Sequence, residues 1–439
     1  MTLGSQLPTV RNPLPGEVGR AYVDRLAATE CPAFTARRKR RAEASGAPHD
    51  PIVWTEALGS NVVDADGNVY VDLTAGFGVA SVGHRHPRVV EAVRAQSEKL
   101  LHALGDVHPS DVKIRLLEKL ASLAPFEGAR TLLALNGADA VETALKTVTL
   151  ASKKPGILAF EGGYHGLSHG PLAVCGYSAA FRAPFREQLN PHVVFAPFPR
   201  ATDDVEAALD AVFACVRDDV GAILVEPILG RGGVWLPPPG FLRGLGERAR
   251  ARGLLVIADE IFVGLGRTGS TFRSVSEGLV PDVLCVGKAL GGGLPVSACV
   301  GRPEVMAAWG SPDGEAIHTG TFYGHPLGAA AALASLEVIE SEGLAARAAE
   351  VGARFRASLE SRGMAHVREV RGAGLVLGVQ LDAPGLSLTV VRSLLEKGYL
   401  ALPAGADASV LQLVPPLVIE ERLLDAFADA LSAVLGALP

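Results

Sequence analysis

The chain has 439 residues, of which 48% are hydrophobic, 20% are charged and 5% are aromatic, and its formal net charge is −6. This length predicts either two packed units or one large α/β unit. The apolar content is too high for a disordered chain. The negative charge and the few aromatic residues give no reason to expect nucleic acid as a partner.

Cysteine usage and the apolar runs indicate the compartment. No apolar run approaches the roughly 18 residues of a membrane span, and the first residues lack the apolar core of a signal peptide. The cysteines, at positions 31, 175, 215, 285 and 299, form no CxxC pair. Their odd number favours reduced thiols over a disulfide framework or a zinc site. We therefore expect a cytoplasmic chain with no metal and no membrane partner.

The N-terminal third begins without a clear pattern. Residues 1–50 are expected to be irregular, and the basic run Arg37–Arg41 is expected to be a solvated segment rather than an anion site. A D-G turn followed by alternation predicts a hairpin over 64–73. Apolar residues at helical spacing predict helices over 86–102 and 109–124.

Residues 130–300 alternate short apolar runs with helical patterns. The runs are 131–135, 156–160, 192–196, 222–226, 254–259 and 283–287, and the helices are 137–152, 203–217 and 240–252. Runs that are apolar on both faces and separated by helices predict a parallel sheet covered on both sides. Beyond 326, the pattern predicts a smaller α+β unit, with helices at 326–342, 343–361, 387–397 and 420–436 and strand-like segments at 370–381 and 410–414.

Reactive side chains follow several of these runs. Asp259 ends the run 254–259, Lys288 follows 283–287, and Glu226 ends 222–226. Asn136 and Gly137 lead from the first run directly into a helix, whose free N–H groups can bind an anion. Because ligands bind at the carboxyl ends of parallel strands, one crevice is expected to collect these groups.

Each feature alone has an ordinary explanation. The lysine can be a surface residue, the aspartate can cap a turn, and a helix that begins at glycine usually holds nothing. Together they match what pyridoxal phosphate requires. A lysine forms a Schiff base with the aldehyde, an aspartate keeps the pyridine nitrogen protonated, and a helix end binds the phosphate. Tyr164 is the candidate aromatic residue that stacks on the ring.

The motifs VGHRHP, NGADAVETALK, EGGYHG, VEPILGRGG, ADEIFVGLGRTG, GKALGGGLP and HTGTFYGHPLGAAAAL extend this pattern. With them the sequence resembles the class III pyridoxal-phosphate-dependent aminotransferases of the aspartate aminotransferase fold (fold type I) from about Pro51 to Leu438. The resemblance implies an α/β fold with a mainly parallel seven-stranded sheet flanked by helices. It places a large cofactor-binding domain at 76–325 and a small discontinuous α+β domain at 1–75 and 326–439.

The resemblance also implies roles for individual residues. Lys288 carries the Schiff base and shuttles the proton, and Asp259 pairs with the pyridine nitrogen. Glu226 lies behind the site or is only a buried structural acid. Thr321 reaches the phosphate of a neighbouring subunit, which implies a homodimer with shared active sites or a tetramer built from dimers. The remaining cofactor contacts are expected from Asn136, Gly137, Ala138, Tyr164 and His165.

The sequence departs from the family where members grip a substrate carboxylate. Leu167 stands where members acting on 4-aminobutyrate, ornithine or acetylornithine carry an arginine. Arg231 replaces a glutamate, and Gln412 replaces the arginine with which that glutamate pairs. Arg231 either binds an anionic substrate group or pairs with a nearby acid. Phe77 and Phe262 are further candidates for the substrate pocket.

We therefore expect an enzyme that acts on small molecules. The favoured function is an aminotransferase that moves an amino group between an amine or amino acid and an oxo acid. The alternative is a racemase, epimerase, aminomutase or lyase on the same scaffold, because fold alone does not choose between these reactions. A cofactor-binding protein without turnover is disfavoured, since Lys288 and Asp259 are both present.

Overall fold

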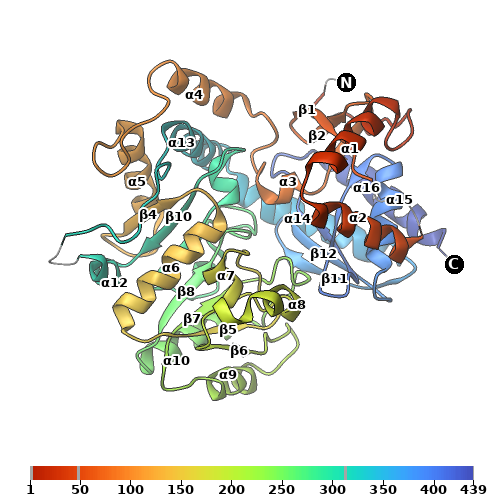
Figure 1. Cartoon of the computed structure of the whole chain (residues 1–439). Helices are drawn as coiled ribbons and strands as arrows, with labels where there is room; N and C mark the ends of the chain where they lie inside the picture. The colour runs from red at the N-terminus through yellow and green to blue at the C-terminus, as the bar shows by residue number, and fades with distance from the viewer. Residues whose placement is uncertain (1–2, 47–49, 311–313, 439) are drawn as a thin grey trace. The chain divides into compact units, whose positions relative to one another are not determined.

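The computed structural model describes residues 3–46, 50–310 and 314–438. The chain divides into two units, a larger one formed by Pro87–Ala346 and a smaller one formed by Met1–His86 together with Arg347–Pro439 (Figure 1). Within the described residues, no helix combines the length and the apolar character that a membrane crossing needs.

The larger unit is built on a seven-stranded sheet in the order β4-β10-β9-β8-β7-β5-β6. Five neighbouring strands, from β9 to β6, are parallel. The predicted fold class is therefore confirmed. The strands are β4 (Arg130–Ala134), β5 (Gly156–Phe160), β6 (Val193–Ala196), β7 (Val220–Val225), β8 (Leu255–Asp259), β9 (Val283–Val286) and β10 (Ser297–Gly301).

Strand β10 was not among the predicted strands. It runs antiparallel to both β4 and β9, so it inserts between two strands that are distant in sequence. Its residues are small, and only ten residues separate it from β9, which leaves no room for a helical crossover that would indicate a further strand. An antiparallel neighbour needs no crossover helix, which is why the alternation of runs and helices did not reveal it.

Helices cover both faces of this sheet, and β5 shows why its strands are apolar throughout. Leu158 and Phe160 pack with the residues of α9 and α10 in one hydrophobic core. Ile157 and Ala159 point the other way and pack with α6 in a second core. The helices of this unit are α4 (Pro87–Ser97), α5 (Asp111–Leu123), α6 (Gly137–Ser152), α7 (His169–Ala173), α8 (Ala179–Arg182), α9 (Val205–Ala214), α10 (Phe241–Ala251), α11 (Arg273–Ser276), α12 (Pro303–Met306) and α13 (Pro326–Ser341), with short 3₁₀ helices at Ala183–Gln188, Lys288–Gly291 and Ala307–Trp309.

The smaller unit contains two four-stranded sheets, in the orders β1-β2-β3-β13 and β11-β12-β15-β14. The hairpin predicted over 64–73 is present as the antiparallel pair β2 and β3. The strands are β1 (Trp54–Leu58), β2 (Asn61–Asp64), β3 (Val69–Asp72), β11 (Val367–Ala373), β12 (Val376–Leu381), β13 (Tyr399–Leu400), β14 (Leu402–Ala404) and β15 (Val410–Leu413), and helices α3 (Ala75–Gly78), α14 (Leu344–Ser361), α15 (Leu386–Glu396) and α16 (Glu421–Gly436) follow in chain order.

The prediction that residues 1–50 are irregular was wrong. The described part of this segment contains two helices, α1 (Glu17–Thr29) and α2 (Pro32–Ser45), while residues 1–2 and 47–49 lie outside the described part. Helix α1 is held at its start by a distant residue, since the carboxylate of Asp66 accepts hydrogen bonds from the backbone N–H groups of Gly16, Val18 and Gly19. Helix α2 buries none of its residues, so its basic run Arg37–Arg41 is carried on a helix without a core-facing stripe.

The two units also end at residues other than the predicted 75/76 and 325/326. Helix α13 packs against α4 and α5, which brings residues 326–346 into the larger unit. Residues 76–86 stay with the smaller unit, where Nε2 of His84 lies 2.7 Å from Oδ2 of Asp72 and His84 forms a backbone bridge with Gly59.

Candidate functional site

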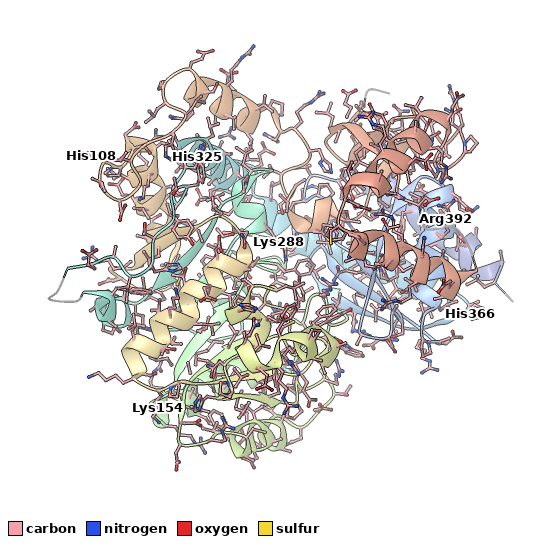
Figure 2. All side chains as sticks on the ribbon, in the orientation of Figure 1. His108, Lys154, Lys288, His325, His366 and Arg392 are labelled. Atoms are coloured by element: carbon pink, nitrogen blue, oxygen red, sulfur yellow. The ribbon has the colours of Figure 1, made fainter. Side chains whose placement is uncertain are left out.

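The carboxyl ends of the parallel strands deliver the predicted reactive groups, all within the larger unit. Strand β8 ends at Asp259, β7 is followed by Glu226, and β9 is followed by Gly287 and Lys288 (Figure 2). Strand β4 leads through Asn136 into helix α6. A twisted parallel sheet places such residues along one edge, so the sheet itself assembles the site.

Lys288 is the only side chain here whose amine can act as a nucleophile. Its backbone has a positive φ of 44°, and its Nζ lies 4.5 Å from the centroid of the Phe262 ring. Loss of solvent lowers the pKa of Lys288, an effect that the charges of Asp259 and Glu226 oppose and that of Arg231 reinforces. A lowered pKa leaves more of the amine neutral and reactive near neutral pH.

Asp259 is held by a buried histidine. Nδ1 of His165 lies 2.7 Å from Oδ2 of Asp259, and the N–H of Ile261 donates to Oδ1 at 3.1 Å. Burial, the largest influence, lowers the pKa of His165, but the hydrogen bond to Asp259 and the charges of Asp259 and Glu226 outweigh it. The pKa of His165 therefore lies above its ordinary value, and an ion pair is favoured.

Glu226 joins the two loops that follow β5 and β7. Its carboxylate accepts from the backbone N–H of Tyr164 at 2.8 Å and from that of Gly230 at 3.1 Å. Burial raises the pKa of Glu226 to about 7, against the opposing effect of His165. Glu226 therefore fixes the backbone of both loops, and it also places a titratable group beside Asp259.

The start of α6 leaves two amides available. Oδ1 of Asn136 accepts from the N–H of Asp139 at 3.1 Å, and its Nδ2 donates to Oδ2 of Asp139 at 3.2 Å, so this side chain caps the helix. Among the described residues, the N–H groups of Gly137 and Ala138 have no acceptor. Free N–H groups at a helix start attract an anion.

Close backbone contacts draw these elements together. A Cβ on Gly137 would lie 3.1 Å from Cδ1 of Ile261, and one on Gly287 would lie 3.4 Å from Cγ2 of the same side chain. Gly166 has a φ of +111°, and a Cβ there would lie 2.6 Å from Cβ of Ala138. The helix start, the Asp259 segment and the lysine segment therefore meet around Ile261.

Arg231 and three aromatic rings form one wall. The guanidinium carbon lies 4.5 Å from the centroid of the Tyr164 ring, 5.0 Å from that of Tyr177 and 5.8 Å from that of Phe181. Burial raises the pKa of Tyr164, and the Arg231 charge partly offsets this. Tyr177 and Phe181 were not predicted as site residues, since they come from the segment that leads into α8 and from α8 itself, and no motif marks them.

The structure does not gather all of the predicted residues. Thr321 lines a different, small cavity with Ser110, Lys113 and His325. Phe77 and Gln412 belong to the smaller unit, where Phe77 is 67% exposed and Gln412 is buried on β15.

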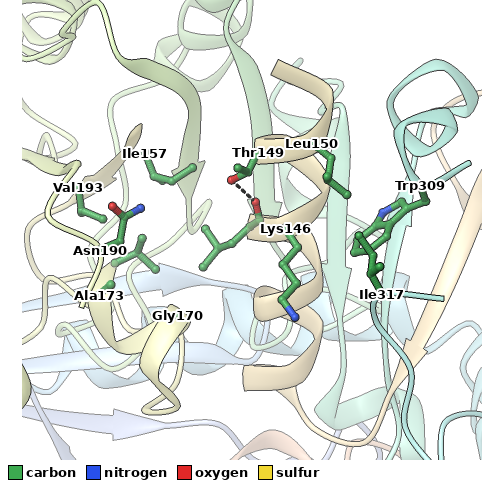
Figure 3. A pocket seen from close by; sticks show the side chains of 12 residues that line it. Lys146, Thr149, Leu150, Ile157, Gly170, Ala173, Asn190, Val193, Trp309 and Ile317 are labelled. Carbon is green, nitrogen blue, oxygen red and sulfur yellow. Dashed lines mark hydrogen bonds between the residues drawn. The ribbon is translucent and has the colours of Figure 1, made fainter. Parts of the chain in front are cut away.

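A second cavity, of about 340 Å³, lies against the flank of α6 (Figure 3). It contains none of the residues predicted for the cofactor or the substrate, and its lining is mainly apolar. The residues around it are Leu145, Lys146, Thr149, Leu150, Ile157, Gly170, Ala173, Val174, Asn190, Val193, Trp309 and Ile317.

Comparisons with known sequences agree with the chemistry of the site. A family model described as aminotransferase class-III matches residues 42–435. The chain is 37% identical over 382 residues to the acetylornithine aminotransferase of Methanosarcina mazei, which covers 87% of this chain and 91% of the relative. It is also 37% identical over 389 residues to that of Mycobacterium tuberculosis, covering 88% and 92%.

Solved structures give the same result. The ω-transaminase of Pseudomonas jessenii in complex with PMP has a TM-score of 0.82 at 26% identity, covering 88% of this chain and 92% of that one. The ornithine aminotransferase of Toxoplasma gondii, described with partial occupancy of PLP at its active site, has a TM-score of 0.77 at 30% identity, covering 95% and 97%. The family, enzyme class and cofactor that the motifs predicted are therefore confirmed. The chain belongs to the class III aminotransferases, which depend on pyridoxal phosphate.

Proposed function

We propose that the chain moves an amino group between an amine or amino acid and an oxo acid, at a site formed around Lys288 and Asp259. The observation that carries this proposal is the meeting of a lysine of lowered pKa, a carboxylate held by His165 and the open start of α6. Its substrates are small molecules.

These groups fit pyridoxal phosphate by their donor chemistry. The amine of Lys288 suits an aldehyde, and the amides of Gly137 and Ala138 suit a phosphate. Asp259 is a buried acceptor for a protonated ring nitrogen, and Tyr164 offers an aromatic face. When bound, the cofactor supplies an electron sink that makes the proton on the substrate α-carbon acidic.

The residues of this chain then have separate tasks. Lys288 would hold the cofactor through its amine and would move the proton at the substrate α-carbon. Asp259 would keep the ring nitrogen protonated, and His165 orients Asp259. Glu226 keeps the loops of Tyr164 and Arg231 in place through two backbone hydrogen bonds.

The substrate is proposed to differ from those of typical 4-aminobutyrate and ornithine enzymes. Leu167, which is 48% exposed, offers no charge where those members carry an arginine. Gln412 cannot form the two-pronged charged contact that an arginine makes with a carboxylate. The relatives from Methanosarcina mazei and Mycobacterium tuberculosis are named acetylornithine aminotransferases, so acetylornithine belongs in any donor screen as the direct comparison.

Half-reactions test the reaction type. Candidate donors are added to cofactor-loaded enzyme without an oxo acid, and the absorbance of the lysine-bound cofactor is followed. An aminotransferase converts one equivalent of donor and stops, whereas a racemase, aminomutase or lyase continues to turn over and keeps its spectrum. Continued turnover without an oxo acid would replace the proposed reaction by one of those alternatives.

A variant tests the assignment of the lysine. Lys288→Ala should still bind the cofactor but should lack the absorbance of its lysine-bound form and transfer no amino group. Lys154→Ala, at an exposed position on the same unit (Figure 2), controls for the loss of a lysine. Full activity of Lys288→Ala would overturn the assignment.

We further propose a homodimer in which Thr321 serves the neighbouring subunit. Large apolar side chains near it are exposed, with Leu101 at 58%, Leu104 at 60% and Phe322 at 51%, and His102 contacts the Phe322 ring at 5.4 Å. Mixing inactive Lys288→Ala with Thr321→Ala tests this sharing, because a mixed dimer would contain one intact site. No gain of activity after subunit exchange would contradict it.

The cytoplasm is the proposed compartment. It is supported by the five cysteines, which are free thiols in the structure. Thiol labelling of the denatured protein, taken directly from cells, should modify all of them.

A further inference from the structure

We propose that Arg231 is the anion-binding residue of this active site and that it selects substrates carrying an acidic group. This inference rests on the proposed function, because it names the substrate class of the same site. It begins from the location of Arg231, whose charge is close enough to Lys288 to contribute to its lowered pKa.

The backbone around Arg231 has little freedom. Leu229 and Trp235 pair across the loop, and the N–H of Gly230 donates to the buried carboxylate of Glu226. A Cβ on Gly230 would lie 2.4 Å from the Phe262 ring, and one on Gly232 would lie 2.5 Å from the carbonyl oxygen of Gly162. The loop is therefore packed against its neighbours on both sides of Arg231.

Aromatic contacts also restrict the side chain of Arg231. The rings of Tyr164, Tyr177 and Phe181 surround the guanidinium, and Tyr164 meets Tyr177 edge to face at 6.2 Å between ring centroids. Rings attract the flat face of a guanidinium but do not satisfy most of its five N–H donors, which lie along its edge. Within this aromatic cage, formed by Tyr164, Tyr177 and Phe181, the guanidinium can still donate two parallel hydrogen bonds along its edge to a carboxylate or a similar oxyanion.

No acid among the described residues pairs with that edge. Across residues 3–46, 50–310 and 314–438, Arg231 forms no ion pair with an aspartate or glutamate. Glu226, the nearest acid in sequence, already accepts from two backbone N–H groups. The alternative of a purely structural pair with a nearby acid therefore has no partner within the described chain.

The expected ligand is an acidic group on the substrate that approaches Lys288. A donor without an acidic group forms no hydrogen bond with Arg231. A donor with a carboxylate forms charge-assisted hydrogen bonds with it, and these strengthen its binding in a partly desolvated site. The relevant comparison is between donors that differ only in the acidic group.

The first experiment measures binding without turnover. Glutarate and methylphosphonate are titrated into cofactor-loaded enzyme by calorimetry, and the dissociation constant is compared between wild type, Arg231→Gln and Arg231→Lys. We expect Arg231→Gln to weaken binding by about 10- to 100-fold, and Arg231→Lys to be intermediate because it lacks the planar fork. Equal binding by all three proteins, or no binding to wild type, overturns the inference.

The second experiment measures selectivity. The ratio of kcat/KM for 4-aminobutyrate to that for n-butylamine should fall by about 10-fold or more in Arg231→Gln, because only the acidic donor loses a charged contact. An unchanged ratio contradicts a role for Arg231, while the reaction type still stands on the half-reaction test. If wild type binds the anions but no donor of the half-reaction screen is converted, the proposed function fails and the anion site remains.

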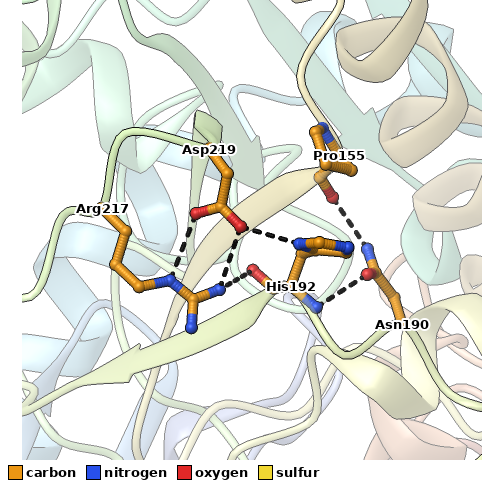
Figure 4. A network of polar contacts seen from close by, with 5 residues as sticks. All are labelled: Pro155, Asn190, His192, Arg217 and Asp219. Carbon is orange, nitrogen blue, oxygen red and sulfur yellow. Dashed lines mark hydrogen bonds and ion pairs between the residues drawn. The ribbon is translucent and has the colours of Figure 1, made fainter.

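Arg217, just before β7, provides a control variant that loses the same charge outside the active site. Arg217 pairs with Asp219, whose carboxylate also contacts Nδ1 of His192 at 2.7 Å, in an exposed network (Figure 4). Arg217→Gln removes the same charge without touching the cage and should leave both the anion affinity and the donor ratio as in wild type.

Discussion

Nδ1 of His165 lies 2.7 Å from Oδ2 of Asp259, and both side chains are buried. One partner comes from the loop after β5 and the other from the end of β8, so the contact ties two strands together at the site. The raised pKa of His165 favours its charged form beside the carboxylate. This contact and the N–H of Ile261 hold Asp259 in one orientation.

Replacing His165 should therefore weaken catalysis through Asp259. His165→Phe keeps the ring volume but donates nothing, and we expect kcat to fall by about 10- to 100-fold, the cost of losing a charged hydrogen bond of about 1.5–3 kcal/mol. His165→Asn can still donate to Asp259 and should recover most of the activity. The pH dependence of the cofactor absorbance should shift most in His165→Phe and less in His165→Asn, which keeps the hydrogen bond but not the charge. A purely structural role would instead lower the thermal stability of both variants and leave that pH dependence unchanged.

Glu260 should make the stability of the protein fall as pH rises. It is buried, only its Oε1 accepts a hydrogen bond (from the N–H of Ser274), and its Oε2 has no partner among the described residues. Burial raises the pKa of Glu260 from 4.5 to about 7. The folded state thus holds a proton that the unfolded state has released, and stability that is complete below pH 4.5 is lost as pH rises through about 7.

Glu260→Gln tests this dependence. The unfolding free energy of the variant relative to wild type should rise between pH 5 and pH 8 by on the order of 1–3 kcal/mol, measured by thermal or urea unfolding. Glu247→Gln, on the exposed face of α10, controls for the lost charge. A difference that is the same at both pH values would contradict a buried neutral Glu260.

Gly166 should be required for the start of α6. Gly166→Ala would place a methyl group 2.6 Å from Cβ of Ala138 at a φ of +111°, which costs about 1–3 kcal/mol in backbone strain before the contact is counted. We expect a lower melting temperature and weaker binding of pyridoxal phosphate, measured by fluorescence titration. Gly385→Ala also has a positive φ but meets nothing within 4 Å, so it should lose stability without losing cofactor affinity.

Asp66 should determine whether α1 is ordered. Its carboxylate accepts from Gly16, Val18 and Gly19, so Asp66→Ala leaves three N–H groups of the helix start without their acceptor. A lost cap costs about 0.5–2 kcal/mol, and trypsin should cut faster after Arg20 and Arg25, as measured by mass spectrometry. Asp24→Ala, on α1 itself, is the matched control. Equal cleavage rates in both variants would show that the cap does not hold the helix.

Much of the larger unit could be predicted from the sequence because its signals are local. Helix α6 begins and ends at the predicted residues, since Asn136 caps it and Gly137 starts it. The strands that bring Asp259 and Lys288 to one edge are apolar on both faces, as a parallel sheet covered by helices on both sides requires. Strand β10 was missed because an antiparallel insertion leaves no crossover helix in the sequence.

The aromatic cage could not be predicted in this way. Tyr177 and Phe181 are distant from Arg231 along the chain, and the segment from Tyr177 into α8 reaches the site through backbone pairing of Tyr177 with Gly163. The cap of helix α1 is equally non-local, because Asp66 lies far from the helix in sequence. Neither the cage nor this cap is marked by a local pattern, so only the folded chain reveals them.

The sequence by itself determined the family and the cofactor and predicted Lys288 and Asp259 as the centre of the site, because motif spacing and strand-end chemistry are properties of short segments. The tertiary structure decided the surroundings of these residues: His165 against Asp259, Glu226 between two loops, and Arg231 among three rings without an acid partner in the described residues. The physical reason is that a motif specifies which groups are present, whereas burial and neighbouring charge, which set their pKa and their ligand, arise only when distant segments pack together.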